Sequence, residues 1–386
     1  SLYCCSDGVR GRGAAVTYLS HRASFHSSEW IAPSNRGIKH LGSWGVRFLQ
    51  VVFGIFAHDE ERNLSYLLDD LQVQDILVAP DIKVEIHVLA NGCFDRTFEF
   101  ASRHELAEIL SAQFLVHDLS ESGKSRTWNR FVHEIAPPTA DMLGFLDADI
   151  RISDPGHLSG LVRQLVARPD LKAFVSHPVP DASGATTMIA RAILRGSGSS
   201  GNWRRSICGQ CYLMPGPIAR DMHLPLGLPV EDGFLSAMLR TDCMENLPGT
   251  QPIDGDPEIS HVFEPERTLR GFLRHQMRII IGGALNAALF TSLREAPDGY
   301  RRQILAKASE DSGWVGQQLK SQLPRRWYGW VPPHFLFKRT RNMLANLHRP
   351  RDFLRIPRIV AYFGLDLLVY LRAQLRMALG TGANFW

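Results

Sequence analysis

The sequence predicts an α/β fold in which helices cover both faces of a doubly wound, mostly parallel sheet, followed by a helical C-terminal extension. Three observations support this class. Short apolar runs without a helical period alternate with amphipathic stretches through the first half of the chain. Polar residues follow several of these runs directly, as they do where parallel strands end beside a ligand. From Arg267 onward the pattern becomes helical and basic.

Five strands are expected in the first half of the chain. The apolar runs that predict them are residues 51–56, 84–89, 114–119, 142–146 and 172–175. Amphipathic stretches beginning near Leu64, Lys124 and Pro155 predict helices after the first, third and fourth strands. Because strands joined by helical crossovers run parallel, their carboxyl ends should lie along one edge of the sheet.

Length and composition divide the chain into three parts. Its 386 residues, 45% of them hydrophobic, suffice for one large domain with appendages. Residues 1–45 are rich in Ser, Gly, His and Arg without a sustained period, which predicts an N-terminal arm. Residues 46–280 are expected to form the sheet domain, and residues 281–386 a helical region rich in basic and aromatic side chains.

Composition also bears on partners and compartment. The formal net charge of +4 indicates no broad nucleic-acid surface, so no nucleic-acid partner is expected. Six cysteines in a chain of this length do not make a disulfide scaffold, and no signal peptide is recognised, which favours the cytoplasm. No stretch reaches the roughly 18 uninterrupted apolar residues of a spanning helix. The basic, aromatic C-terminal region predicts a peripheral contact at the inner face of a membrane, with a solvated basic face as the alternative.

Two carboxylates follow the fourth predicted strand, at Asp147 and Asp149. Alternate residues of a strand point to opposite faces, so the two can share a ligand only if the chain bends after Leu146. Carboxylate oxygens suit Mg²⁺ or Mn²⁺, which substrate phosphates usually help to coordinate. The alternative is that Asp147 caps the next turn and Asp149 faces solvent.

Two further segments leave alternatives open. The Gly-Ser-Gly-Ser-Ser-Gly stretch at residues 196–201 is typical of a mobile active-site lid or of a plain surface loop. Cys208-Gly209-Gln210-Cys211 has the spacing of a redox or zinc pair, but a second pair is missing, so structural packing is the preferred interpretation.

Parts of the sequence fit two other interpretations of the chemistry. Gly123-Lys124-Ser125 follows a strand, as in a nucleotide-binding P-loop, but Asp118 stands where that motif requires glycine. A nucleotide-binding protein without catalysis is possible on this fold, yet it leaves the many polar residues at strand ends without a physical reason.

Five segments in order resemble family 2 glycosyltransferases of the GT-A fold. They are residues 52–63, residues 91–97, residues 123–129, Asp147-Ala148-Asp149 and Glu231-Asp232, and the resemblance covers about residues 50–280. Each segment is weak alone, but the five together are specific. Sugar nucleotidyltransferases share this fold, but their glycine-rich loop after the first strand is replaced here by the acidic residues 58–62.

The resemblance implies roles at the catalytic centre. Asp149, with Asp147 near the ribose or the metal, would hold Mg²⁺ or Mn²⁺. Asp232 would be the general base, and Glu231 would position the acceptor. His261, on a strand expected at residues 258–264, would complete the metal or diphosphate site, with a structural histidine as the alternative.

The resemblance also implies a donor site, formed by Ala57, Asp59, Glu60, Asn91, Lys124, Asn129 and Arg278. Asn91 replaces the acid that commonly reads uracil, so the base stays unspecified. The segment around Arg278 lacks the Gln-x-x-Arg-Trp pattern of processive members, which disfavours polymerisation. The implied function is a metal-dependent, inverting, non-processive transfer of sugar from a nucleotide-diphospho-sugar to a glycan or lipid-linked acceptor, in the synthesis of surface polysaccharide or glycolipid.

Overall fold

The computed structural model describes residues 48–183, 203–247, 251–322, 328–345, 354 and 356–379. By its contacts the chain divides into two units, Ser1–Val46 and Arg47–Trp386, and all described residues belong to the second. The expected N-terminal arm (residues 1–45) and the Gly-Ser-rich segment (residues 196–201) lie outside the described residues.

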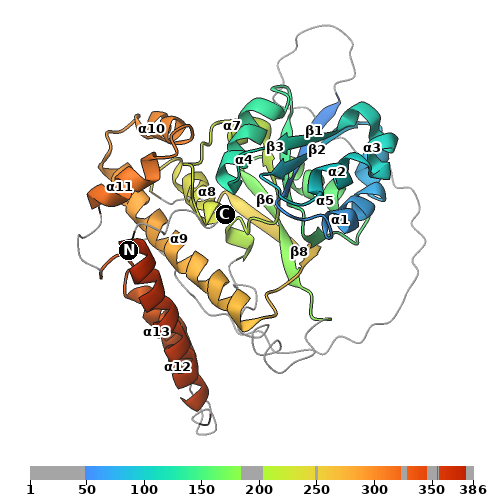
Figure 1. Cartoon of the computed structure of the whole chain (residues 1–386). Helices are drawn as coiled ribbons and strands as arrows, with labels where there is room; N and C mark the ends of the chain where they lie inside the picture. The colour runs from blue at the N-terminus through green and yellow to red at the C-terminus, as the bar shows by residue number, and fades with distance from the viewer. Residues whose placement is uncertain are drawn as a thin grey trace. The chain divides into compact units, whose positions relative to one another are not determined.

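In the described part of the chain, eight strands form one sheet in the order β3-β2-β1-β4-β7-β6-β8-β5 (Figure 1). Strands β3, β2, β1 and β4 run parallel to one another, and β6 runs parallel to β8. Strand β7 is antiparallel to both β4 and β6, and β5 is antiparallel to β8. The predicted mostly parallel sheet is confirmed. The strands are β1 (Leu49–Ala57), β2 (Ile82–Asn91), β3 (Phe114–Leu119), β4 (Met142–Asp147), β5 (Ile150–Arg151), β6 (Ala173–Pro180), β7 (Cys211–Pro215) and β8 (Ile253–Phe263).

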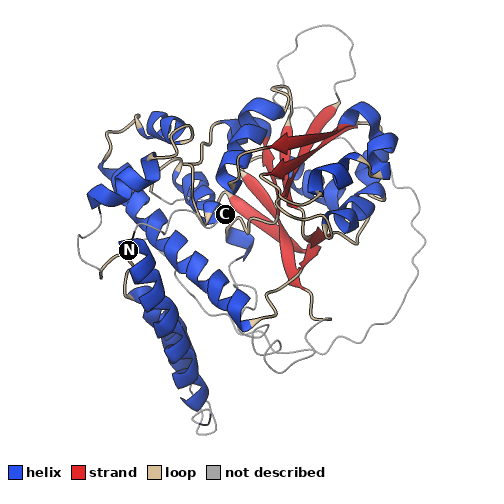
Figure 2. Ribbon diagram, in the orientation of Figure 1, coloured by secondary structure: helices blue, strands red, loops and turns tan. Residues whose placement is uncertain are grey.

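Helices cover the sheet and continue beyond it into the predicted C-terminal extension, which is also confirmed (Figure 2). Those around the sheet are α1 (Leu64–Gln72), α2 (Thr97–Ser102), α3 (Glu105–Leu110), α4 (Lys124–Arg130), α5 (His157–Ala167), α7 (Gly216–Arg220) and α8 (Glu231–Thr241). The extension comprises α9 (Leu269–Glu295), α10 (Arg301–Ala308), α11 (Trp314–Gln322), α12 (His334–Ala345) and α13 (Ile356–Ala378). Shorter turns are η1 (Asp75–Val78), η2 (Ser111–Gln113), η3 (Phe131–Ile135) and η4 (Trp203–Arg205).

The central strand β1 shows why the sheet is covered on both faces. Val51, Phe53 and Ile55 pack on one face with the leucines of α1, whereas Val52 and Phe56 pack on the other with aromatic residues of α4 and η3. A strand buried on both sides needs a continuous apolar run, which is the pattern seen in the sequence. Burial of each large side chain contributes about 1.5 to 3 kcal/mol.

Helix α9 ties the extension to the sheet domain. The predicted domain boundary at residue 280 falls inside this helix. A side chain at Gly282 would come within 2.3 Å of Val230, so only glycine allows α9 this close to the start of α8. Asn286 Nδ2 donates a hydrogen bond of 3.0 Å to the carbonyl of Val230. Helix α9 therefore fixes the position at which α8 begins. None of the described helices is both long and apolar enough to cross a membrane.

Candidate active site at the strand ends

The carboxyl ends of β1, β2 and β4 meet at one edge of the sheet. Phe56 pairs with Asp147 in the register of β1 and β4, and the Ala148 amide donates to the Phe56 carbonyl at 3.1 Å. The chain then turns at Ala148 and Asp149 before β5. This is the bend after Leu146 that two neighbouring carboxylates need if they are to face the same ligand.

Lys124 stands at the start of α4 and links three segments of this edge. Its Nζ lies 2.7 Å from Asp147 Oδ1 and 3.4 Å from Glu231 Oε1, and it donates to the Gly209 carbonyl at 3.0 Å. Burial alone would lower the pKa of Lys124, but the two carboxylates raise it above the ordinary lysine value. The lysine is therefore a fixed positive charge beneath the site.

One lysine does not neutralise the carboxyl groups around it. Burial, and then the charge of Asp149, raise the pKa of Asp147 to about 7 in spite of the opposing Lys124. Burial also raises the pKa of Glu60 to about 7, with further contributions from Asp149 and Asp95. Such shifts mean that the carboxylates repel one another in a poorly solvated place. A divalent cation with a preference for oxygen ligands would relieve that repulsion, so the residues present fit Mg²⁺ or Mn²⁺.

Asp232 lies in the first turn of α8, where its Oδ1 accepts a 2.7 Å hydrogen bond from the Gly233 amide. A carboxylate at a helix start ordinarily has a low pKa. Here burial, and then the charge of Glu231, raise the pKa of Asp232 to about 6, while Lys124 and Arg278 oppose the rise. The folded protein itself thus supplies the desolvation that raises this pKa. A group that titrates near neutrality suits general-base catalysis.

A cavity of about 10 Å³ adjoins these charges, with room for about one water molecule. Lys124, Glu231 and Asp232 line its polar side, and Trp128 and Tyr212 its aromatic side, where the Trp128 indole donates to the Tyr212 hydroxyl at 2.9 Å. The two carboxylates of α8 therefore face a small, partly apolar space.

The Cys208-Gly209-Gln210-Cys211 segment places Gly209 against the carboxylate of Asp232. This glycine has a φ of +78°, and a side chain there would come within 3.3 Å of the Asp232 carboxylate. Burial raises the pKa of both cysteine thiols, Cys208 and Cys211, to about 12, so they are poor nucleophiles and metal ligands. This supports the structural interpretation of the segment. The role of Gly209 was not predicted from the sequence. A glycine shortly before β7 was the signal that could have indicated it.

The loops after β1 and β2 are joined through Asp59, which has the left-handed φ of +56°. Its Oδ1 accepts hydrogen bonds from the amides of Phe94 and Asp95, at 2.7 and 3.3 Å. Ala57 ends β1, and Glu60 is held by a 2.8 Å hydrogen bond from Asn63. The loop predicted to meet a nucleotide is thus braced by the chain itself.

Asn91 ends β2 with its side chain buried. Its Oδ1 has no hydrogen-bond partner among the described residues, while its carbonyl bonds to His58 Nδ1 at 2.7 Å. A buried, unpaired amide oxygen is costly and suits a ligand that brings an N–H group. The role of Asn91 at a nucleotide stays a prediction.

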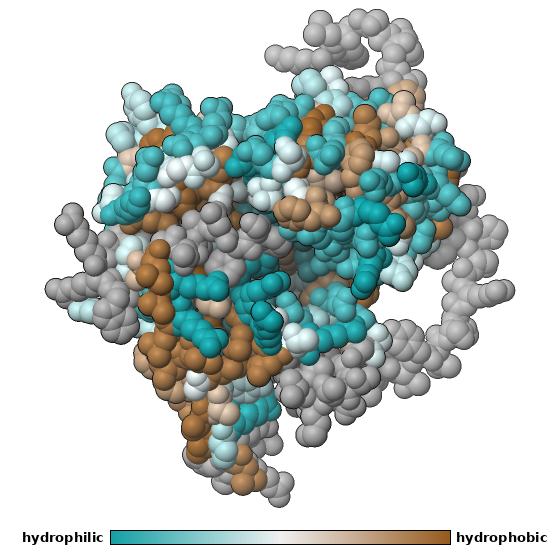
Figure 3. All heavy atoms as spheres, in the orientation of Figure 1, coloured by the Kyte–Doolittle hydropathy of each residue, from teal (hydrophilic) through white to brown (hydrophobic). Residues whose placement is uncertain are grey.

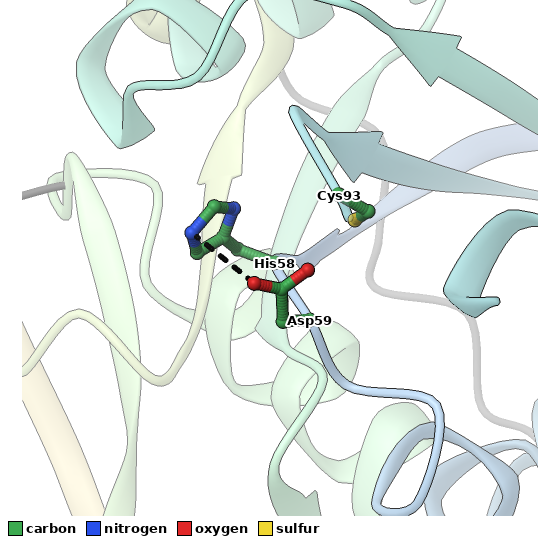
Figure 4. A group of neighbouring side chains, drawn as sticks. All are labelled: His58, Asp59 and Cys93. Atoms are coloured by element: carbon green, nitrogen blue, oxygen red, sulfur yellow. Dashed lines mark ion pairs between the residues drawn. The ribbon is translucent and has the colours of Figure 1, made fainter. Parts of the chain in front are cut away.

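A second set of possible metal ligands lies on the same loops. Among the described residues, His58, Asp59 and Cys93 bring a nitrogen, an oxygen and a sulfur within 4.8 Å of one another (Figure 4). Asp147, Asp149 and His261 do not form such a group in that part of the chain. Burial raises the pKa of the Cys93 thiol, which disfavours the thiolate that a metal would need.

Two predicted site residues are engaged elsewhere. The amide of Asn129 bonds to both the carbonyl and the amide of Leu224, at 2.7 and 3.0 Å, so it secures a loop beside the cavity. His261 is fully buried, and its two ring nitrogens lie 2.7 Å from Ser176 Oγ and 3.1 Å from Gln210 Oε1. Either residue would have to give up a hydrogen bond to touch a ligand, and their ligand roles stay predictions.

The sequence matches no protein-family model and no curated protein sequence. Solved structures do match in shape. Mannosyltransferase PcManGT from Pyrobaculum calidifontis, in complex with GDP-Man and Mn²⁺, is 16% identical, with a TM-score of 0.49 over 85% of this chain and 86% of that one.

Two other similar structures are S. aureus TarS 1–349 and a synthase from Mycobacterium tuberculosis. TarS is 14% identical, with a TM-score of 0.44 over 86% of this chain and 92% of its own. Glucosyl-3-phosphoglycerate synthase, in complex with Mn²⁺, UDP-glucose and phosphoglyceric acid, is 17% identical, with a TM-score of 0.41 over 67% and 87%. The Pyrobaculum calidifontis protein is a mannosyltransferase by name, and at such identities and TM-scores the likeness carries no conclusion about the activity of this chain.

Proposed function

We propose that this chain is a metal-dependent, inverting glycosyltransferase that moves a sugar from a nucleotide-diphospho-sugar to an acceptor hydroxyl. The observation that carries the proposal is the joint position of Asp149, Lys124 and Asp232 at the strand ends. One connected group of side chains contains two neighbouring aspartates suited to a cation, a fixed lysine and a carboxylate that titrates near neutrality. We also propose that the chain belongs to family 2 of the glycosyltransferases, which its five sequence segments resemble.

Asp149 is the proposed principal metal ligand, with Asp147 beside it. Asp147 is already bonded to Lys124, so it is better placed to orient the ribose or the metal shell than to bind alone. Bound there, Mg²⁺ or Mn²⁺ would neutralise the diphosphate as it leaves. His261 belongs to this set only if it gives up its bond to Gln210.

Asp232 is the proposed general base. Above pH 6 it is mostly ionised and can accept the proton of an acceptor hydroxyl held beside Glu231. The acceptor oxygen then bonds to the anomeric carbon as the bond from that carbon to the diphosphate oxygen breaks. A single displacement of this kind inverts the configuration of that carbon. Arg278, whose charge is felt at Asp232, is proposed to meet the departing diphosphate.

The donor nucleotide is proposed to lie against Ala57, Asp59, Glu60 and Asn91. The unpaired Asn91 Oδ1 would accept from the base or ribose, and the braced Asp59 loop would keep its shape on binding. The proposed acceptor is a glycan or lipid-linked hydroxyl used in surface polysaccharide or glycolipid synthesis, by non-processive transfer in the cytoplasm. Neither the sugar nor the base is specified by these contacts.

A donor screen tests the proposal. Nucleotide sugars, beginning with GDP-mannose and UDP-glucose, are incubated with protein and Mn²⁺, and released nucleoside diphosphate is measured. We expect release with at least one donor, and a decrease of about 10²- to 10⁴-fold in Asp232→Asn, which keeps donor affinity. Asp118→Asn is the matched control, because Asp118 is an exposed carboxylate near the end of β3.

Equal rates in Asp232→Asn and wild type would show that Asp232 is not the general base. Donor binding without release from any donor would favour a non-catalytic nucleotide-binding protein.

A further inference from the structure

Helices α12 and α13 carry an apolar surface that the sheet domain does not cover. On α13, the buried residues Ile359, Val369, Ala373 and Met377 face the protein, where the helix packs against α9 and α12. The hydroxyl of Tyr370 and the amide of Gln374 both donate to the Val331 carbonyl, at 2.9 Å each. The helix is therefore held with a defined face outward.

That outward face is apolar along the whole helix. Its members, the apolar face of α13, are between 36% and 63% exposed, and they are Ile356, Val360, Leu367, Leu368, Leu371 and Leu375. At about 100° per residue these positions span an arc of about 120°, which is a continuous stripe. Figure 3 shows hydrophobic side chains gathered over α12 and α13 at its lower left. Scattered apolar residues on a surface are ordinary, but a stripe of this length marks an interaction surface.

The exposed charges of α12 and α13 are all of one sign. Lys338 and Arg341 on α12, and Arg358, Arg372 and Arg376 on α13, are exposed. Among the described residues of the two helices the acidic residue is Asp366, which is buried and lies 3.4 Å from Arg339. The two helices therefore combine an apolar stripe with exposed cations, here called their basic edge, and show no exposed carboxylate in the part that the structure describes.

We infer that the apolar face of α13, together with the basic edge of α12 and α13, docks on the surface of a bilayer that contains anionic lipid. Helices that lie in the interface plane combine an apolar face with Lys and Arg at its edge, and the cations attract anionic headgroups. A second copy of the chain fits less well, because pairing two such faces would bring cationic edges together without carboxylates to balance them. This inference goes beyond the proposed sugar transfer and does not depend on it.

Sedimentation with vesicles tests the inference on the full chain. Vesicles of phosphatidylcholine with about 30% phosphatidylserine should bind the protein at least tenfold more tightly than vesicles of phosphatidylcholine alone, and about 0.5 M salt should remove most of this difference. Leu371→Gln with Leu375→Gln should weaken binding by at least about tenfold. The matched control is Val78→Gln with Ile109→Gln, which removes apolar side chains from η1 and α3 that are more exposed than Leu371 and Leu375.

A second pair of variants tests the charges. Arg358→Gln with Arg372→Gln should weaken binding to the anionic vesicles only, and Arg103→Gln with Arg163→Gln, two exposed arginines on the sheet domain, should leave it unchanged. If the leucine variant fails to fold, which circular dichroism would show, the arginine variant still tests the inference. Failure of the wild-type chain to bind anionic vesicles, or equal loss in the control variants, would overturn the inference. A dimer that Leu371→Gln with Leu375→Gln dissociates, in the absence of vesicle binding, would assign the face to a second copy instead.

Discussion

The strand-end site and the α12–α13 pair differ in the sign and the solvent exposure of their charged side chains. At the strand ends, the carboxyl groups of Glu60, Asp147 and Asp232 are crowded into poorly solvated positions that raise their pKa values. On α12 and α13, exposed lysine and arginine flank leucine side chains in open solvent. Crowded, buried carboxylates that outnumber their one paired lysine are costly, so the first region indicates a ligand and chemistry. Exposed charge beside an apolar stripe costs little, so the second indicates association.

The largest expected effect follows from removing the proposed metal ligand. Asp149→Asn should lower the rate of sugar transfer by at least about 10³-fold, because a bound cation supplies several kcal/mol of charge stabilisation to the leaving group. Steady-state release of nucleoside diphosphate measures this loss. Asp118→Asn, which changes an exposed carboxylate near the end of β3, should keep the wild-type rate. Activity of Asp149→Asn within a few-fold of wild type would show that the acidic edge is not the metal site.

The next effect is on stability. Lys124→Met leaves the carboxylates of Asp147 and Glu231 without their shared cation, and we expect a loss of about 3 kcal/mol in the free energy of unfolding. Lys83→Met breaks a pair with Glu85 in which the lysine is half exposed, and it should cost less than about 1 kcal/mol. Urea unfolding of both variants gives the comparison. Equal losses of unfolding free energy in the two variants would mean that Lys124 contributes no more than the lysine of a surface ion pair.

A smaller effect concerns pH. The folded pKa values of Glu60 and Asp147, about 7, lie above their unfolded values of 4.5 and 3.8, so the folded protein holds more protons and its stability falls as pH rises through 7. Below about pH 6.5 the buried histidines act in the opposite direction, because burial lowers the pKa of His87 and His157 to about 4.

Stability of the ligand-free protein should therefore be highest near pH 6.5, and Tm should fall by about 3 °C between pH 6.5 and 8. Asp149→Asn should flatten this fall, because the charge of Asp149 raises both carboxyl pKa values. Differential scanning calorimetry across the range measures it. A Tm that rises steadily to pH 8 in the wild type would contradict the assigned shifts.

The smallest expected effect comes from the other region. Arg358→Gln with Arg372→Gln should change sugar transfer to a water-soluble acceptor by less than about twofold, because both side chains are exposed on α13 and Arg358 stacks on Tyr362 of the same helix. The assay is the same measurement of nucleoside diphosphate release, without vesicles. A large loss in solution would mean that the two regions are not independent.

The sequence predicted the first four strands because each is a short apolar run without a helical period. It did not predict that β7 would enter antiparallel between β4 and β6, since nothing in the run from Cys211 to Pro215 specifies its neighbours. The two-residue strand β5 was too short to leave a pattern. Local patterns therefore determined the elements, while long-range pairing determined the order of half the sheet.

The site was predictable only in part for the same reason. Acidic residues at Asp147, Asp149 and Asp232 are visible in the sequence because carboxylates at strand and helix ends are distinctive. The partners of a polar residue are not visible: Asn129 bonds to a loop 95 residues away, and His261 to Gln210, 51 residues away. The raised pKa of Asp232 likewise depends on burial that only the folded chain provides.

Thermal unfolding with ligands tests the central claim most directly, namely that the acidic strand ends bind a cation and a nucleoside diphosphate together. Wild type and Asp149→Asn are heated with Mn²⁺ and each of UDP, GDP, dTDP and CDP. The proposal predicts that at least one nucleotide with Mn²⁺ raises the Tm of the wild type, and that the rise is lost in Asp149→Asn. No rise with any nucleotide, or an equal rise in Asp149→Asn, would contradict it.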